Sequence, residues 1–196
     1  MTTGECSDLL IHSIRRSGTH LLMASIYNNF VLPDMSREIE SNFRTFNGIE
    51  TKGKVKGPWF KLFGGHYAGN AVRVGKDIFI YRHPVKCFYS LWVFSNEPPV
   101  EQWLSKKNLL HWKSEIEKVQ KSGILAIRYE DLINRFSWVM EQIQGYTGLT
   151  PKREPYKPLE RPVGWNAFES GKGTFPDQTL QFMREILGNP IFDYQI

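Results

Sequence analysis

The chain has few cysteines and no long apolar run, and both absences narrow the class of protein. Only two cysteines, Cys6 and Cys87, occur among the 196 residues. They lie far apart and match neither a metal-binding nor a redox spacing, so we expect reduced thiols rather than a disulfide framework. No apolar stretch approaches the roughly 18 residues that a membrane-spanning helix needs, and residues 1–8 lack the basic head and apolar run of a signal peptide. We therefore expect a soluble, cytoplasmic protein.

Charge of one sign is not concentrated in any block. The net charge is +5 and the isoelectric point is near 9.2, a balance that suits anionic ligands without choosing among them. Lysine and arginine are spread along the chain, which argues against a nucleic-acid-binding arm. Because 41% of the residues are hydrophobic and 14% are aromatic, we expect one globular domain, residues 1–196, with a sizeable core.

Short apolar runs alternate with helical patterns along the chain. Strands are expected at residues 9–14, 59–63, 77–81 and 124–128, and helices at 19–30, 85–94, 100–122, 132–146 and 179–187. Residues 33–57 and 150–174 are expected to be irregular loops. Because each strand is nearly all apolar, we predict an α/β fold with a central, mostly parallel sheet flanked by helices.

The turn between the first expected strand and helix has the residues of a phosphate-binding turn. Arg15 to His20 read Arg-Arg-Ser-Gly-Thr-His. Backbone N–H groups at such a turn point toward the ligand, and the helix dipole favours an anion. Gly18 allows close approach of a phosphate, and Arg16 adds a planar donor fork. It is not a Walker A loop, because Gly-x-x-x-x-Gly-Lys-Ser/Thr is absent. An ordinary helix start capped by Ser17 or Thr19 is the alternative.

A second strand end also carries groups that suit a phosphate. Arg82 follows the strand at 77–81, and Ser90 lies eight residues further on, on a helix face that could turn back toward Arg82. A guanidinium and a hydroxyl there could hold a second phosphate. The alternative is a surface arginine and a serine that faces solvent.

A third strand end adds an aromatic residue. Tyr129 follows the strand at 124–128 and could present its ring to a base. Glu130 and Asp131 could also belong to the site, but a helix start with Asp131 as the capping residue explains them equally well. In open parallel α/β sheets, ligands bind outside the carboxyl ends of the strands. The three segments together therefore favour one nucleotide site.

These segments resemble the signatures of the sulfotransferases that use 3′-phosphoadenosine 5′-phosphosulfate (PAPS). The family's first signature reads roughly Pro-Lys-Ser-Gly-Thr-Thr-Trp, and residues 15–21 read Arg-Arg-Ser-Gly-Thr-His-Leu. Its second signature, an arginine at a strand end with a serine eight residues later, is matched by Arg82 and Ser90. A later Tyr-Glu-Asp is matched by residues 129–131, and a C-terminal Arg-Lys-Gly is matched in part by residues 171–173. The matches follow the family's order over most of the chain.

The resemblance implies a donor site with contributions from each segment. The residues implied to bind PAPS, or its product 3′-phosphoadenosine 5′-phosphate (PAP), are Arg15, Arg16, Ser17, Gly18, Thr19, His20, Arg82, Ser90, Tyr129, Phe168, Lys172 and Gly173. Residues 16–20 would hold the 5′-phosphosulfate. Arg82 and Ser90 would hold the 3′-phosphate, with help from Lys172 and Gly173. The two aromatic residues would flank the adenine, with Trp165 as a further choice for the second wall.

The implied reaction is in-line transfer of a sulfuryl group to a hydroxyl or amine, without a metal. His66 would be the base that accepts the acceptor's proton, with His20 as its competitor, and Arg16 would stabilise charge on the leaving group. None of the five histidines shows a metal-ligand spacing. Three departures from the family pattern are Arg16 for its lysine, Leu21 for its adenine-stacking tryptophan and Gly171 for its last arginine.

Several alternatives stay open. A nucleotide-kinase-like phosphotransferase would need a Walker lysine and a metal-holding aspartate at a strand end, and the first is absent. A non-catalytic binder of nucleotide or nucleic acid would make His66 dispensable but keep Arg82 essential. The acceptor could be a small molecule, a glycan or a lipid. Because the chain is shorter than typical members of the family, we expect acceptor-binding elements to be reduced or to come from another subunit of a homo-oligomer.

Overall fold

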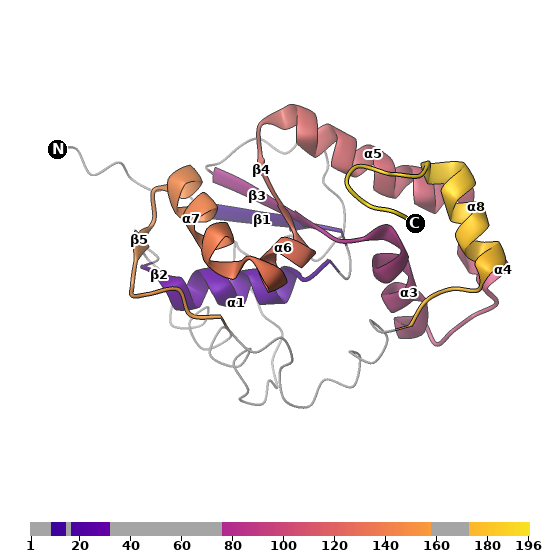
Figure 1. Ribbon diagram of the computed structural model, residues 1–196, viewed down its shortest axis with the longest axis horizontal. Helices are drawn as coiled ribbons and strands as arrows, with labels where there is room; N and C mark the ends of the chain where they lie inside the picture. Colours follow the sequence, from indigo (N-terminus) through magenta and orange to yellow (C-terminus); the bar gives the residue numbers. More distant parts are fainter. Residues whose placement is uncertain (1–8, 15–16, 32–75, 158–172) are drawn as a thin grey trace.

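Three parallel strands form the main sheet. The computed structural model describes residues 9–14, 17–31, 76–157 and 173–196 (Figure 1). In this part of the chain the strands of the sheet are β1 (Leu9–Ser13), β3 (Lys76–Tyr81) and β4 (Leu125–Arg128), in the order β1-β3-β4. A separate antiparallel pair joins β2 (Phe30–Val31) to β5 (Thr150–Pro151). The fold is mixed α/β, mostly helical with a small parallel sheet, which confirms the predicted class.

The helices begin and end where the local chemistry favours it. They are α1 (Thr19–Asn29), α3 (Pro84–Phe94), α4 (Val100–Trp103), α5 (Lys106–Ser122), α6 (Tyr129–Asn134), α7 (Phe136–Thr147) and α8 (Asp177–Leu187). Pro84 is the first residue of α3, as predicted. Gly123 and Gly148 take the left-handed conformation that ends α5 and α7. None of the described helices is both long enough and apolar enough to cross a bilayer.

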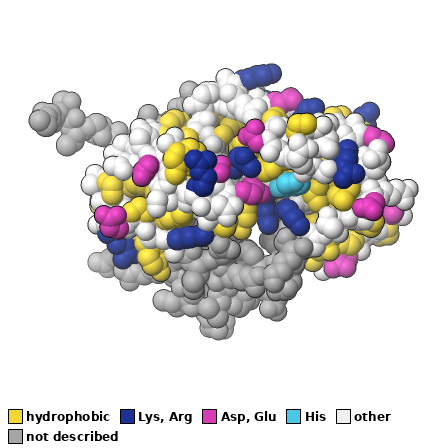
Figure 2. Space-filling model, in the orientation of Figure 1, with side chains coloured by type: hydrophobic (Ala, Val, Ile, Leu, Met, Phe, Trp, Pro, Cys, Tyr) yellow, Lys and Arg dark blue, Asp and Glu magenta, His cyan; other side chains and the backbone are white. Residues whose placement is uncertain are grey.

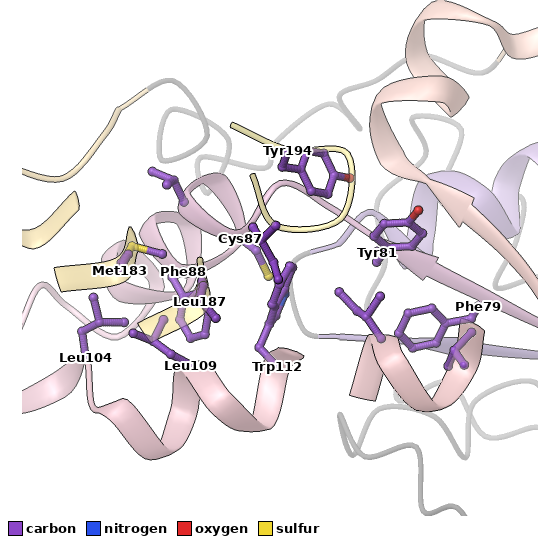
Figure 3. Close-up of a cluster of buried hydrophobic side chains, with 14 of the residues drawn as sticks. Phe79, Tyr81, Cys87, Phe88, Leu104, Leu109, Trp112, Met183, Leu187 and Tyr194 are labelled. Carbon is purple, nitrogen blue, oxygen red and sulfur yellow. The ribbon is translucent and has the colours of Figure 1, made fainter. Parts of the chain in front are cut away.

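Strand β3 contributes to two hydrophobic clusters. Ile78 and Ile80 pack with side chains of α1, α6 and α7, whereas Phe79 and Tyr81 pack with side chains of α3, α5 and α8. This division follows from the strand period, in which successive side chains point to opposite faces. In Figure 3, Trp112 of α5 lies between the labelled side chains of α3 and α8 and those of β3. The strand is therefore apolar on both of its faces.

The sheet also contains a buried polar pair. His12 of β1 and Asp77 of β3 are both buried, and the His12 Nε2 atom lies 3.3 Å from Asp77 Oδ2. Burial lowers the pKa of His12, and the Asp77 carboxylate opposes that shift in part. The strands are thus less uniformly apolar than expected.

Two predicted helices are each divided, so the prediction of continuous helices was wrong. The stretch 100–122 forms α4 and α5, because Leu104 is extended (φ −86°, ψ 92°) and the Ser105 hydroxyl accepts the Asn108 N–H at 3.2 Å to start a new helix. The stretch 132–146 is preceded by helical residues from Tyr129 and is interrupted at Arg135 (φ −130°).

The predicted loops are tested only in part. Residues 150–174 were expected to be irregular, but Thr150–Pro151 forms β5, because its backbone pairs with β2. The predicted strand at 59–63 and the predicted loop at 33–57 lie outside the described residues.

Candidate functional site

The ends of the three parallel strands bring the predicted segments to one edge of the sheet. The register pairs Ser13 with Ile80 and Tyr81 with Arg128. Because parallel strands run in the same direction, the chain leaves β1, β3 and β4 at neighbouring points. The turn before α1, Arg82 and Tyr129 therefore start side by side.

Helix α1 begins without a side-chain cap. Its N-cap residue is Gly18, in the left-handed conformation with φ +91°, and no side chain caps the helix. The Thr19 hydroxyl instead donates to the Ser13 Oγ atom at 2.6 Å, and the Ser17 N–H donates to the Ile14 carbonyl at 3.2 Å. The alternative of a cap by Ser17 or Thr19 is therefore wrong.

The first turn of α1 favours an anion. Its first intrahelical hydrogen bond runs from the Leu22 N–H to the Gly18 carbonyl at 3.0 Å. The N–H groups before Leu22 have no acceptor within the helix. The first turn also contains no acidic residue. The positive end of the helix dipole is thus not offset by a carboxylate within that turn.

Tyr129 touches both predicted anion-binding segments. A Cβ atom at Gly18 would lie 2.7 Å from the Tyr129 Cε2 atom and would collide with its Cδ2 atom, so only glycine permits this contact. The Arg82 guanidinium carbon lies 4.5 Å from the centroid of the same ring. The turn before α1 and Arg82 therefore lie on the same side of the molecule, separated by one aromatic ring. The Tyr129 ring thus contacts Gly18 and Arg82, whereas the sequence predicted that it would lie beside the base of a nucleotide.

One donor atom of Arg82 lacks a hydrogen-bond partner in the described part of the chain. Its Nε atom is buried and has no hydrogen-bond partner among the described residues. Buried polar atoms are rarely left in this state, because the lost hydration is costly. The carboxylate of Glu130 accepts hydrogen bonds from other groups.

Helix α3 connects Ser90 to the turn. Cys87 and Ser90 are both buried, and they lie three residues apart on one face of the helix. The Cys87 Sγ atom lies 3.8 Å from the Ser17 Oγ atom. The alternative of a Ser90 that faces solvent is therefore wrong, since its side chain lies in the interior on the face that contacts the turn.

The segment that begins at Gly173 also lies against α3. The Lys86 ammonium group donates to the Gly173 carbonyl at 3.0 Å. A Cβ atom at Gly173 would collide with the Tyr89 ring, so the backbone packs directly on that ring. Tyr89 in turn packs against Trp92 and Phe175, with ring centroids 5.5 Å and 5.3 Å away. This part of the predicted donor site is therefore close to the helix that carries Ser90.

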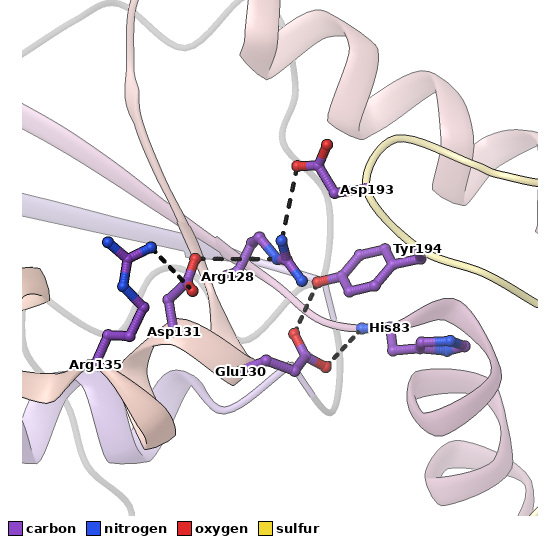
Figure 4. Close-up of polar contacts among 7 residues, drawn as sticks. All are labelled: His83, Arg128, Glu130, Asp131, Arg135, Asp193 and Tyr194. Atoms are coloured by element: carbon purple, nitrogen blue, oxygen red, sulfur yellow. Dashed lines mark hydrogen bonds and ion pairs between the residues drawn. The ribbon is translucent and has the colours of Figure 1, made fainter.

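A second set of polar contacts involves His83 and Glu130, the residues that follow Arg82 and Tyr129 in the chain (Figure 4). Glu130 accepts the His83 N–H at 3.1 Å through Oε1 and the Tyr194 hydroxyl at 2.8 Å through Oε2. His83 Nδ1 accepts the Val85 N–H at 3.2 Å and so caps α3, and its Nε2 atom lies 2.7 Å from the Gln195 carbonyl. Because Nδ1 accepts, the neutral ring must donate through Nε2. Burial lowers the pKa of His83, which favours this neutral form.

Charged residues of β4 and α6 surround this network. Arg128 lies 4.0 Å from Asp131 and 3.8 Å from Asp193, and its guanidinium carbon is 4.8 Å from the Tyr194 ring centroid. Asp131 also lies 3.9 Å from Arg135. No side chain caps α6, so the reading of Asp131 as the helix cap is wrong. Burial, followed by the nearby Glu130 carboxylate, raises the pKa of Tyr194 well above its usual value.

Charged side chains are visible together on this face of the molecule. Figure 2 shows basic, acidic and histidine side chains near its middle, in the orientation of Figure 1. Carboxylates are thus mixed with the cations, and the face is not uniformly basic. Any anion that binds there must be recognised by particular residues rather than by a broad positive field.

Other predicted site residues cannot be placed. Those outside the described residues are Arg15, Arg16, His66, Phe168 and Lys172. Only the backbone of His20 is described, at the start of α1. The sequence prediction also missed two residues that hold the site. His83 had no assigned role, and Tyr194 carried no signal at all, because its contact with Glu130 spans 64 positions.

Comparisons with known proteins add no assignment. Neither the protein-family models nor the curated proteins nor the solved structures contain a match to this chain. The functional argument therefore depends on the residues and contacts described above.

Proposed function

We propose that this chain is a sulfotransferase that uses PAPS as its donor and an acceptor with a hydroxyl or amine group. The observation that carries the proposal is the contact of one Tyr129 ring with both Gly18 and Arg82. It supports a ligand that carries two separate phosphates, one at each segment. The finer features of the predicted fold, a P-loop-like turn and a central sheet flanked by helices, belong to the same proposal.

The described residues fit such a donor. The start of α1 offers N–H groups with no acid in its first turn, and Arg82 has a buried Nε atom without a partner in the described part of the chain. Tyr129 fills the space beside the Gly18 Cα atom, so the N–H groups of the helix start are the donors that remain for the 5′-phosphosulfate. Arg82 and the α3 segment with Ser90 are the partners for the 3′-phosphate.

The chain's residues would act mainly by positioning and by charge stabilisation. When bound, PAPS supplies an activated sulfuryl group, and its transfer leaves PAP. Arg82 fixes one end of the nucleotide, so that the other end lies in line with the acceptor. Arg16 and the N–H groups of the turn stabilise charge on the departing phosphate oxygens. His66 accepts the proton of the acceptor. The proposal gives no role to a metal.

Calorimetry tests the bisphosphate site. PAP should bind far more tightly than AMP or ATP, and Arg82→Ala should lower the affinity for PAP about 10- to 100-fold, as expected for lost hydrogen bonds to a charged group. The affinity for AMP should change little. Arg82→Lys is the matched control, because it keeps the charge but loses the planar donor fork. Equal affinity of the wild-type protein for PAP and AMP would remove the case for a 3′-phosphate site.

Transfer from radiolabelled PAPS to a panel of acceptors tests the reaction. His66→Ala should keep the affinity for PAP but lower turnover by about 10²- to 10⁴-fold, the usual contribution of a general base. His20→Ala provides the comparison, since His20 is the competing base. Tight binding of PAP without transfer to any acceptor would favour a non-catalytic binder instead.

A further inference from the structure

We infer that the C-terminal turn, residues 191–196, is a clamp that positions Arg82 and Tyr129 by tying together the segments that follow β3 and β4. The inference rests on the proposed function for the ligand that this pair binds. The clamp contacts His83, which follows Arg82 in the chain, and Glu130, which follows Tyr129.

The first contact of the clamp is a chain of two hydrogen bonds. The Tyr194 hydroxyl donates to one oxygen of Glu130 at 2.8 Å, and the other oxygen accepts the His83 N–H at 3.1 Å. A single carboxylate thus joins the C-terminal turn to the segments after both strands. Any movement of Glu130 shifts its neighbour Tyr129, and through the His83 backbone it shifts Arg82.

The second contact is made directly by His83. Its Nε2 atom lies 2.7 Å from the Gln195 carbonyl, and its ring centroid is 5.0 Å from that of Tyr194. The turn therefore holds His83 through its backbone, by way of Glu130, and through its side chain. Two contacts on one residue restrict rotation as well as translation.

The turn is itself anchored, as a clamp requires. Ile191 and Tyr194 are buried and exchange two backbone hydrogen bonds at 2.9 Å and 3.0 Å. The Arg184 Nε atom of α8 donates to the Ile196 carbonyl at 2.6 Å, and the Ile196 N–H donates to Asn189 Oδ1 at 3.0 Å. These contacts hold residues 191–196 to α8 and to the loop that follows it.

The clamp also keeps a carboxylate occupied near Arg82. Both Glu130 oxygens accept hydrogen bonds, one from Tyr194 of the clamp and one from the His83 N–H, and Glu130 directly follows the tyrosine on which Arg82 lies. Without the Tyr194 hydroxyl, one oxygen would lose its donor and could compete with a phosphate for the arginine. The clamp therefore favours phosphate binding by Arg82 in two ways. It positions Arg82 and Tyr129, and it keeps the Glu130 carboxylate from competing with the phosphate for the arginine.

Three substitutions test the inference, with one control. Tyr194→Phe keeps the buried ring but removes the hydroxyl, Glu130→Ala removes the carboxylate, and Glu130→Gln keeps an acceptor for His83 and a polar group for Tyr194. Tyr156→Phe removes an exposed hydroxyl from residues 151–157, outside the clamp. Two quantities are measured for each variant: the hydrogen-exchange rate of the His83 amide by NMR, and the affinity for PAP by calorimetry.

The clamp predicts that the two quantities change together. Tyr194→Phe should speed exchange of the His83 amide and lower the affinity for PAP about 2- to 10-fold, the range expected for one typical intramolecular hydrogen bond. Glu130→Ala should have a larger effect on both, and Glu130→Gln should restore values near those of the wild-type protein. Tyr156→Phe should change neither.

The possible failures are distinguishable. Unchanged His83 exchange in both Tyr194→Phe and Glu130→Ala would overturn the clamp. Faster exchange with unchanged affinity for PAP would overturn the positioning role, because the turn would then only stabilise the fold. If the wild-type protein binds no PAP, the proposed function fails together with the positioning role, whereas the exchange rates still decide whether the turn holds the two strand ends.

Discussion

Gly18 meets two requirements that a side chain would violate. Its φ of +91° is unfavourable for other residues, and its missing side chain leaves room for the Tyr129 ring. Gly18→Ala should therefore lower the free energy of unfolding by roughly 2–4 kcal/mol, the sum of a left-handed backbone and a steric overlap. Urea unfolding measures this change, and calorimetry should show weaker binding of PAP.

Gly148 is the matched control for this prediction. It also has a positive φ, +74°, but a Cβ atom there would meet nothing within 4 Å. Gly148→Ala should cost only the backbone share, about 1–2 kcal/mol. Adding Tyr129→Ala to Gly18→Ala should recover part of the larger loss. Equal losses at the two glycines would mean that the contact with Tyr129 contributes nothing.

At the residue scale, the sequence predicts the proposed ligand-binding groups better than the groups that hold them. Gly18 and Arg82 follow strands directly, and strand ends in parallel sheets meet at one edge. Tyr194 lies far along the chain from Glu130, and no local pattern connects them. Ser90 is buried and does not face solvent, whereas its predicted approach to Arg82 stays a prediction.

At the element scale, helix α5 contributes one face to the hydrophobic cluster that contains Phe79 and Tyr81 of β3. Its buried residues recur at intervals of three or four positions, which places them on one face. They are Leu109, Trp112, Glu115, Ile116 and Val119. The helix packs through this face against α8, and Lys113 donates to the Leu187 carbonyl at 3.1 Å.

Two adjacent leucines of α5 allow a matched test. Leu109 is fully buried, whereas 42% of the Leu110 surface is exposed. Leu109→Ala should lower the free energy of unfolding by about 2–5 kcal/mol, as for other buried leucines. Leu110→Ala should change it by less than about 0.5 kcal/mol. Thermal unfolding of both variants measures the difference, and similar midpoints would contradict the assigned packing.

The three strands of the parallel sheet were predictable because each contains a short apolar run, but helix continuity was not. Apolar residues keep their helical period across Arg135, so periodicity alone cannot reveal the break there. The break before α5 did leave a signal, since Ser105 is a favoured N-cap residue. The β5 strand left none, because two residues are too few to form a pattern.

At the scale of the whole molecule, stability should depend on pH through two histidines, His12 and His83. Burial lowers the pKa of both His83 and His12. At pH values between the lowered pKa in the folded protein and about 6.5, these histidines bind protons in the unfolded chain but not in the folded chain. The free energy of unfolding should therefore fall as the pH drops below about 6.5, by at most about 1.4 kcal/mol per pH unit for each histidine. Urea unfolding between pH 7.5 and pH 5, a range that spans the ordinary histidine pKa, measures this slope.

His83→Asn separates the two contributions. Asparagine can still accept the Val85 N–H as a helix cap but does not titrate in this range. The variant should therefore show a shallower dependence on pH, with the remainder due to His12. A slope identical to that of the wild-type protein would mean that His83 is protonated equally easily in the folded and unfolded chains.

The Cys87 thiol, buried beside the Ser17 hydroxyl, provides an intrinsic reporter of the turn. An alkylating reagent can reach such a sulfur only when the surrounding structure opens transiently. The rate of alkylation at Cys87 therefore measures how often α3 separates from the start of α1. Peptide mass spectrometry distinguishes this rate from that of Cys6. A nucleotide that binds both segments should slow the reaction, which would provide a screen for ligands without any assay of turnover.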